Sequence, residues 1–457
     1  VQKIIAKFQK QSNEKKYLLQ GSVASFVLQM IAVVVSFGLS IVLTRTLGAD
    51  AYGSYTYVFL WFTLIGSLLV VGLDILLVRQ MAQYLSEKNR PMAKGVLLFA
   101  TLVVVLIASS VSLGLYYTLN YTNLSQLLAY FNYNTDWLHN KEVVGVINVA
   151  LIGLPILSLL KLLQGALRGA KLIISAQITE ILVKPLLLLG FIAASYYYYT
   201  YVTLAQAVNY HIGAVFLALF AVLLLVGYKL YLPFLQKSKA KYDTKKWTKS
   251  AAYLFLIGSV SLVNVHLDVL MLGALSSTTE VGIYNIALKL ASMLKLTLVV
   301  LNVVFSPLIT DLYAQNKLTE LQQMATQSIR VVFLLALPIA LVFVLFGVSI
   351  LSLWGPEFIE GYRALLLLCV AQMFNVACGS VGNILVMTKY ENAVLKAIAL
   401  STLLNLALNY WLIPVWGMTG AAMATGVSIV TWNFILVLVI VRALGIDPTV
   451  FAWFRKK

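Results

Sequence analysis

Four lysines interrupt stretches of this sequence that are otherwise apolar. They are Lys161, Lys184, Lys289 and Lys295. A charged side chain at the centre of a lipid bilayer costs about 2.5–3.5 kcal/mol on insertion scales, so it is retained where water or a counter-ion meets it. We expect these lysines to make a cationic, anion-binding cavity, although Lys161 is also close enough to a span end to reach the membrane interface.

Polar residues repeat at helical spacing inside the same apolar stretches. Residues three, four or seven apart share one helix face, so each set predicts a polar stripe on a buried helix. Stripes of small polar residues also pack helices together through hydrogen bonds, and this alternative stays open. The stripe residues that we expect to line a cavity are Gln29, Ser36, Ser40, Asn264, Asp268 and Asn285.

Three carboxylates fall within predicted spans and are candidates for ion coupling. They are Asp74, Glu180 and Asp268. Glu180 and Lys184 are four residues apart, so a simple ion pair between them is an alternative explanation for both. Arg45, at the outer end of the first span, is either a further substrate contact or an interface anchor.

Motifs of soluble enzymes do not occur in the sequence. No phosphate-binding GxxxxGK[ST] loop is present, so transport powered by ATP hydrolysis in this chain is excluded. The three histidines, His139, His211 and His266, are far apart, and no His, Cys and carboxylate cluster has the spacing of a metal site. We therefore expect no catalytic residues, no metal site and no cofactor.

The composition indicates a polytopic α-helical membrane protein. Hydrophobic residues make up 61% of the 457 residues and charged residues 11%, far from the balance of a soluble domain. Apolar runs long enough to span a bilayer recur throughout. The net charge of +17 does not require nucleic acid, because basic residues gather in cytoplasmic loops. We predict twelve spans at residues 20–44, 54–78, 95–118, 143–165, 172–195, 206–228, 251–275, 282–306, 329–350, 363–387, 394–414 and 420–443.

The distribution of the 33 lysines and arginines predicts the orientation. With the N-terminus in the cytoplasm, the outer segments hold only Arg45, Lys141 and Arg363, whereas the inner segments hold most of the others. The positive-inside rule therefore places both termini in the cytoplasm. Residues 1–19, with lysines beside apolar side chains, are expected to form an amphipathic segment at the inner surface.

A weak internal repeat divides the chain into halves. Gly53 and Tyr55, in a polar turn after the first span, recur about half a chain later as Gly282 and Tyr284. A period this long indicates a duplicated domain rather than a solenoid. The predicted organisation is an N-terminal segment at 1–19, a six-helix bundle at 20–228, a basic linker at 229–250, a second six-helix bundle at 251–443 and a cytoplasmic tail at 444–457.

The opening of the chain resembles a known family. An apolar span leads into Arg45-Thr46-Leu47-Gly48 and Tyr52-Gly53-Ser54-Tyr55, and a second span ends near Gly72-Leu73 and Arg79. This pattern is similar to that of bacterial polysaccharide-transport proteins, the O-antigen and oligosaccharide flippases of the multidrug/oligosaccharidyl-lipid/polysaccharide exporter superfamily. The second copy of the turn has Gly273 or Ala274 near the place of Arg45, so the arginine is not duplicated.

The resemblance implies a MATE-like fold of two pseudo-symmetric six-helix bundles in a V shape. It also implies that the protein moves an undecaprenyl-pyrophosphate-linked oligosaccharide across the bacterial cytoplasmic (inner) membrane by alternating access. The partners expected are this lipid-linked substrate, the membrane, and a polysaccharide polymerase or ligase, but no nucleic acid. The alternative is a cation-coupled multidrug exporter of the same superfamily, which would need cavity acids rather than lysines, and Asp74, Glu180 and Asp268 keep it open.

Overall fold

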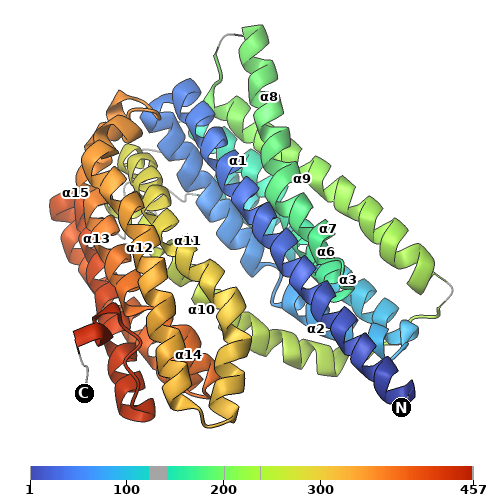
Figure 1. The fold of residues 1–457 in the computed structure, drawn as a ribbon. Coiled ribbons are helices and arrows are strands. Elements are labelled where there is room, and N and C mark those ends of the chain that lie inside the picture. Colours follow the sequence, from blue (N-terminus) through green and yellow to red (C-terminus); the bar gives the residue numbers. More distant parts are fainter. Residues whose placement is uncertain (1, 123–140, 200, 237, 455–457) are drawn as a thin grey trace. The chain divides into compact units, whose positions relative to one another are not determined.

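The computed structural model describes residues 2–122, 141–199, 201–236 and 238–454, and every regular element in this part of the chain is helical (Figure 1). The side chains of residues 1–19 and the segment 123–140 lie outside the description, so the amphipathic character of the N-terminal segment stays a prediction. The elements are α1 (Gln2–Leu68), α2 (Leu73–Ser86), α3 (Arg90–Tyr121), α6 (Lys141–Gly169), α7 (Ile173–Ile178), η1 (Thr179–Val183), α8 (Lys184–Tyr199), α9 (Leu204–Val226), η2 (Gly227–Leu235), α10 (Thr244–Leu275), α11 (Thr278–Ala314), α12 (Leu318–Leu351), η3 (Pro356–Gly361), α13 (Tyr362–Cys378), α14 (Val381–Met387), α15 (Glu391–Leu444) and η4 (Val450–Phe454).

The expected all-helical membrane fold is confirmed. Within the described residues, nine helical stretches are long and apolar enough to cross a membrane. Two of them, Val27–Leu68 and Glu391–Leu444, contain a glycine at which the helical path breaks: Gly48 has φ +75° and Gly417 has φ +52°. Glycine adopts a positive φ easily, because it has no Cβ to clash with the backbone. Each of the two stretches is therefore two helices that meet at its glycine. The count of twelve spans stays a prediction.

Contacts between residues divide the chain into two compact units. Unit 1 comprises residues 1–47 and 58–263, and unit 2 comprises residues 48–57 and 264–457. In unit 1, α6 is central and packs on α2, α3 and α9, while α8 lies beside α9 (Figure 1). In unit 2, α13 is central and packs on α11, α12 and α15. The predicted division at the basic linker stays a prediction.

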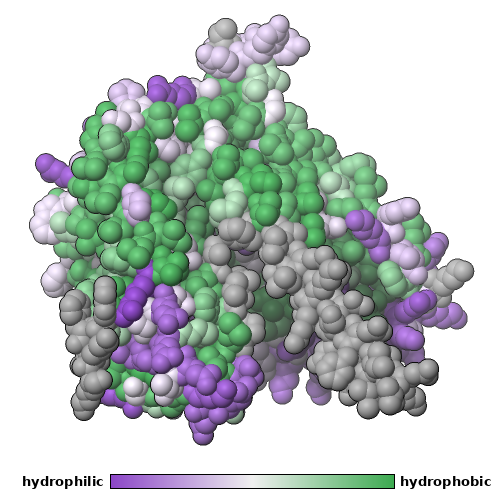
Figure 2. Space-filling model, viewed as in Figure 1, coloured by the Kyte–Doolittle hydropathy of each residue, from purple (hydrophilic) through white to green (hydrophobic). Residues whose placement is uncertain are grey.

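Apolar side chains cover much of the molecular surface. Leu102, Leu345, Val370 and Trp411 are each more than 60% exposed, although exposed apolar residues in a soluble protein are usually scattered singly. Green apolar atoms dominate the face seen in Figure 2, and hydrophilic residues gather toward the ends of the helices. Such a surface requires a hydrocarbon environment, as the composition predicts.

The two copies of the repeated turn touch each other inside unit 2. Gly53, on the segment 48–57, packs against α11, where a Cβ would overlap the carbonyl oxygen of Thr278. A Cβ on Gly282 would lie 3.0 Å from the Cα of Gly53. Beside this contact, the Asp50 carboxylate accepts hydrogen bonds from Thr278 Oγ1 at 3.2 Å and Thr279 Oγ1 at 3.0 Å. These threonines open α11, where a negative charge also suits the helix dipole.

We expect Gly53→Ala to destabilise the protein by about 1–3 kcal/mol, because the added methyl group must push main-chain atoms apart. Gly38→Ala, on the α1 segment before the Gly48 break, is the control, because a Cβ there meets nothing within 4 Å. Thermal unfolding in detergent measures both variants. An unfolding temperature of Gly53→Ala equal to that of Gly38→Ala would show that the close contact does not form.

Candidate functional site

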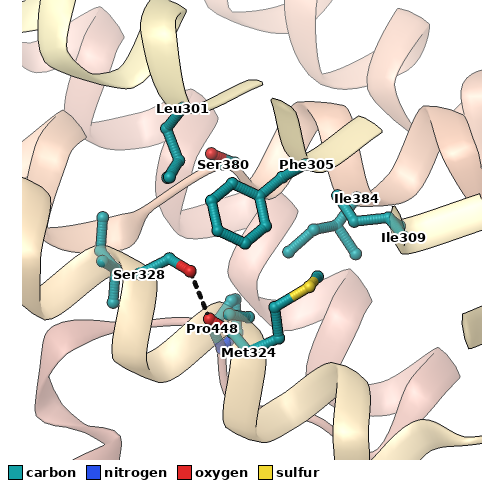
Figure 3. A pocket seen from close by; sticks show the side chains of 10 residues that line it. Leu301, Phe305, Ile309, Met324, Ser328, Ser380, Ile384 and Pro448 are labelled. Carbon is teal, nitrogen blue, oxygen red and sulfur yellow. Dashed lines mark hydrogen bonds between the residues drawn. The ribbon is translucent and has the colours of Figure 1, made fainter. Parts of the chain in front are cut away.

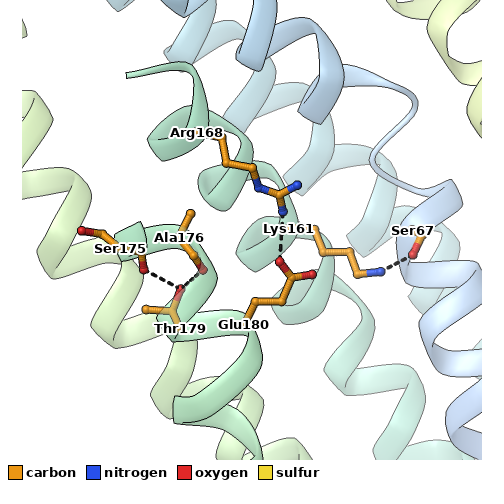
Figure 4. Close-up of polar contacts among 7 residues, drawn as sticks. All are labelled: Ser67, Lys161, Arg168, Ser175, Ala176, Thr179 and Glu180. Atoms are coloured by element: carbon orange, nitrogen blue, oxygen red, sulfur yellow. Dashed lines mark hydrogen bonds and ion pairs between the residues drawn. The ribbon is translucent and has the colours of Figure 1, made fainter. Parts of the chain in front are cut away.

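Lys161, the first of the predicted cavity lysines, lies on α6 against the end of α1. Its ammonium group donates a hydrogen bond to Ser67 Oγ (Figure 4). One helical turn earlier, Ser158 Oγ donates to the carbonyl oxygen of Gly66 at 2.9 Å. Because α1 ends at Leu68, its last carbonyl groups have no partner within the helix and carry partial negative charge. The helix end therefore offsets part of the cost of burying the Lys161 charge.

Arg168 and Glu180 form an ion pair across the α6–α7 turn. Arg168 Nη2 lies 3.2 Å from Glu180 Oε2, and both side chains are partly exposed (Figure 4). Glu180 belongs to η1, a π-helical segment that ends two residues before Pro185. Proline has no N–H to bond the carbonyl of residue i−4 and its ring crowds that carbonyl, so the helix widens there. Among the described residues, Glu180 forms its ion pair with Arg168 and not with Lys184.

Close helix packing brings Asp74 to the same site. A Cβ on Gly165 would lie 2.7 Å from the carbonyl oxygen of Asp74, so α2 and α6 approach at main-chain distance. Lys161 is within electrostatic range of Lys184, Glu180, Asp74 and Arg168. We call Lys161, Arg168 and Lys184 the basic cluster of unit 1; its three cations face two carboxylates, which leaves a net positive charge.

Gln164 adds an unused donor to the α6 face that carries Lys161 and Arg168. Its side chain is 2% exposed, and Nε2 makes no hydrogen bond to the described residues. Buried polar atoms are nearly always hydrogen-bonded, so an unused donor calls for an acceptor. Ammonium, guanidinium and amide donors together suit an oxygen-rich anion such as a phosphate.

Asp268 is the centre of a hydrogen-bond network in unit 2. Asn409 Nδ2 donates to Asp268 Oδ1 at 2.9 Å, and Thr425 Oγ1 donates to Asp268 Oδ2 at 2.5 Å. The Thr425 hydroxyl lies 3.2 Å from the Tyr284 hydroxyl, and Asn409 also donates to Asn405 Oδ1 at 3.0 Å. Four helical segments, on α10, on α11 and on each side of the Gly417 break in α15, thus meet at one carboxylate. We call these five residues the Asp268 network.

The Asp268 network has the oxygen chemistry of a small-cation site. Asn409 Oδ1 is buried and has no hydrogen-bond partner among the described residues. Together with the carboxylate, Asn405 Oδ1 and Thr425 Oγ1, it offers several oxygen atoms on converging helices, and exchange of the amide O and N positions would keep this set available. Oxygen atoms of side chains and main chain are the ligands with which helical transporters hold Na⁺ or H⁺.

The remaining predicted residues of unit 1 lie on α1. Ser40 is buried and donates to the carbonyl oxygen of Phe37 at 2.8 Å, Ser36 is half-buried, and Gln29 and Arg45 are exposed. The Ser40 bond is a local helical one, as expected where a hydroxyl packs within its own turn. Their place in a cavity stays a prediction.

In unit 2, the predicted residues other than Asp268 are spread around the helices. Lys289 and Asn285 are half-buried on α11 and Lys295 is exposed. Six residues separate the two lysines, which places them about 120° apart around the helix. Asn264 Oδ1 accepts a hydrogen bond from Thr402 Oγ1 at 2.8 Å. The structure therefore does not align Lys289 and Lys295 on one face.

Several residues of both sites escaped the sequence reasoning. Ser67, Thr425 and Tyr284 are separated in sequence from the groups that they contact, so no spacing rule connects them. One feature of the sequence indicates Tyr284, because this residue belongs to the repeated turn. Asn405 and Asn409 are different, because their i, i+4 spacing indicates from the sequence alone a polar stripe on one face of a predicted span.

An apolar cavity elsewhere in unit 2 is too small for substrate. It has a volume of about 20 Å³ and lies between α11, α12, α14 and the chain at Pro448 (Figure 3). This is room for about one water molecule. Ser380 Oγ in its wall has no hydrogen-bond partner among the described residues, and Ser328 Oγ donates to the Met324 carbonyl at 2.5 Å. We therefore assign it no transport role.

Comparison with known families gives two overlapping matches. The family model described as "Polysaccharide biosynthesis protein" matches residues 18–313, which is more than half of the chain. The MatE family model matches residues 262–411. A curated relative, "Probable flippase AglR" of Haloferax volcanii, is 28% identical over 200 residues, which cover 41% of this chain and 40% of that protein. The aligned part thus spans well under half of the relative.

Solved structures share the fold at low sequence identity. An inward-facing multidrug resistance MATE family transporter of the MOP superfamily has a TM-score of 0.74 at 11% identity, covering 93% of this chain and 98% of that one. The Lipid II flippase MurJ in an inward closed conformation has a TM-score of 0.67 at 12% identity, covering 92% and 87%. A MOP superfamily transporter from Pyrococcus furiosus has a TM-score of 0.61 at 13% identity, covering 94% and 96%. The MATE-like fold expected from the sequence is confirmed.

Thr425→Val, which keeps the side-chain shape, is expected to destabilise the protein by about 2 kcal/mol. It removes a donor from the buried Asp268 carboxyl group and the hydroxyl partner of Tyr284. Thr402→Val removes one bond to the neutral amide of Asn264 and is expected to cost about 1 kcal/mol. Thermal unfolding in detergent compares them, and equal losses would mean that the Asp268 network adds nothing beyond an ordinary hydroxyl bond.

Proposed function

We propose that this chain, which belongs to the polysaccharide biosynthesis protein family, is a flippase for an undecaprenyl-pyrophosphate-linked oligosaccharide. It moves the polysaccharide repeat unit from the inner to the outer leaflet of the bacterial cytoplasmic membrane. The family match, the relative named a probable flippase and the fold shared with the Lipid II flippase MurJ support this proposal. The chain supplies no ATP-hydrolysing motif, so the energy comes from outside its own chemistry.

The basic cluster of unit 1 carries the proposal. Lys161, Arg168 and Lys184 lie among apolar helices, and Glu180 and Asp74 are the carboxylates of the described residues within electrostatic range of Lys161. A pyrophosphate group presents several anionic oxygens, which guanidinium and ammonium groups bind through charge-assisted hydrogen bonds. The buried donor of Gln164 fits the same ligand. An apolar substrate would gain nothing from these groups, and a cationic one would be repelled.

The remaining predicted residues contribute further contacts in this proposal. Lys289, Lys295 and Arg45 meet the anionic part of the substrate along its path. Neutral polar side chains bind sugar hydroxyl groups through hydrogen bonds that tolerate different sugars. These neutral residues are Gln29, Ser36, Ser40, Asn264 and Asn285.

Cation coupling through Asp268 completes the mechanism. Asp74 and Glu180 face the basic cluster of unit 1, whereas the described partners of Asp268 are neutral donors that a cation can replace. A cation that binds Asp268 in only one of two conformations shifts the equilibrium between them by its differential affinity. Alternating access then exposes the substrate site to the inner and afterwards to the outer leaflet. In this proposal both termini lie in the cytoplasm, and the expected partner is a polysaccharide polymerase or ligase that uses the flipped repeat unit.

Removal of a basic-cluster charge is expected to slow flipping. In proteoliposomes with a fluorescent undecaprenyl-pyrophosphate oligosaccharide, Lys161→Ala and Lys184→Ala should each slow flipping at least about tenfold, since each loses a charge-assisted bond of about 1.5–3 kcal/mol. Lys289→Ala and Lys295→Ala should lose surface polysaccharide in cells while the protein stays in the membrane. Lys317→Ala is the control, because Lys317 pairs with Glu320 at the surface. Full flipping by both unit 1 variants would remove the argument for an anionic substrate.

Asp268→Asn is expected to uncouple transport from the ion gradient. Wild-type flipping in the same vesicles should rise when a sodium or proton gradient is imposed, and the variant should flip at one low rate with or without the gradient. Asp311→Asn, on α11 outside the Asp268 network, is the control. A variant that keeps the full gradient response would overturn the coupling role. Drug resistance conferred on an exporter-deficient host, without flipping, would instead favour the multidrug exporter.

A further inference from the structure

Glu180 is one of two carboxylates at the basic cluster of unit 1 and the one that forms an ion pair with Arg168. Its Oε2 atom lies 3.2 Å from Arg168 Nη2, and the two side chains keep 48% and 41% of their surface exposed. Lys161 and Lys184 are both within electrostatic range of the same carboxylate. The anion nearest to the basic cluster therefore belongs to the protein itself, and it is held loosely enough to exchange.

The π-helical segment η1 gives Glu180 its direction. In a regular α-helix, Glu180 and Lys184 would be neighbours on one face, at i and i+4. Glu180 lies in the π-turn, and among the described residues its carboxylate forms an ion pair with Arg168 on α6 rather than with Lys184. Lys184 remains within electrostatic range of the same carboxylate. Single π-turns of this kind occur frequently at functional sites.

We propose that Glu180 is a built-in counter-ion that competes with the anionic headgroup of the substrate for Arg168. In the empty site it occupies the guanidinium, and an incoming pyrophosphate displaces it. Binding is then an exchange of anions, and return of Glu180 helps to release the product. This inference rests on the proposed anion-binding function of the basic cluster and adds a residue that sets its affinity.

Glu180 and phosphate can replace each other at Arg168. The ion pair between Arg168 and Glu180 is partly exposed and screened by water, so it contributes little to stability and phosphate displaces Glu180 easily. A phosphate group offers more acceptor oxygens and more negative charge than one carboxylate, and guanidinium binds it in a bidentate manner. The other carboxylate in range, Asp74, lies on α2, and among the described residues Arg168 forms its ion pair with Glu180 instead. Glu180 is therefore the competitor.

The test measures binding of inorganic pyrophosphate to the purified full-length protein in detergent by titration calorimetry. Glu180→Gln keeps the shape and removes the charge, and it should bind pyrophosphate about three- to tenfold more tightly than wild type, since a competing partly exposed ion pair is lost. Glu180→Asp should stay close to wild type. Glu320→Gln is the matched control, because Glu320 forms a similarly exposed pair with Lys317 at 3.3 Å in unit 2.

Whether Glu180→Gln binds pyrophosphate more tightly or more weakly than wild type distinguishes a competing counter-ion from a purely structural role of Glu180. A carboxylate that only held Arg168 in position would weaken pyrophosphate binding when neutralised, so weaker or unchanged binding by Glu180→Gln overturns the inference. Arg168→Gln should weaken binding, and in that background Glu180→Gln should no longer tighten it, because the two act through one contact. If neither wild type nor Glu180→Gln binds pyrophosphate, the anion-binding function itself fails.

Discussion

A charge inside an apolar helix bundle must find a partner or be excluded, and this constraint shapes both sites of the molecule. In unit 1 the partner lies at the end of a helix, because the Lys161 ammonium group donates a hydrogen bond to Ser67 in the last turn of α1. In unit 2 the partners are neutral donors, because an amide and a hydroxyl group donate hydrogen bonds to the Asp268 carboxylate. Both central groups are thus held by neutral hydroxyl or amide partners in the described part of the chain.

Irregular backbone is what makes these solutions available. The end of α1 at Leu68, the π-turn before Pro185 and the break at Gly417 each interrupt a helix beside a charged or polar group. At Gly417, the Glu280 carboxylate accepts a hydrogen bond from the backbone N–H of Met418 at 2.8 Å and so caps the following helix. Regular helices would bury all their main-chain groups in internal hydrogen bonds and offer nothing to a substrate or an ion.

The sequence alone predicted the class of fold and most of the charged members of the sites. Apolar length and the lack of charge fix membrane helices, and these signals depend on composition rather than on tertiary contacts. Helical spacing also placed Glu180 and Lys184 on one helix. Spacing could not predict the ion pair between Glu180 and Arg168, because the two residues lie on different helical elements and only folding brings them together.

The sequence also did not predict how each helix is rotated about its own axis. Lys289 and Lys295 looked equivalent, because both interrupt one apolar run, yet one is half-buried and the other exposed. The partners of Asp268 come from helices more than a hundred residues apart in the chain, and only packing brings them together. Stripe patterns identify which helices carry polar faces, but neighbours decide what those faces meet.

The contact between Gly53 and Gly282 ties the two copies of the repeated turn to each other. It joins main chain to main chain, and the hydroxyl bonds from Thr278 and Thr279 to Asp50 lie beside it. Neither glycine has a side chain that could be shortened. A larger residue in one copy therefore cannot be accommodated by a change at the glycine of the other copy.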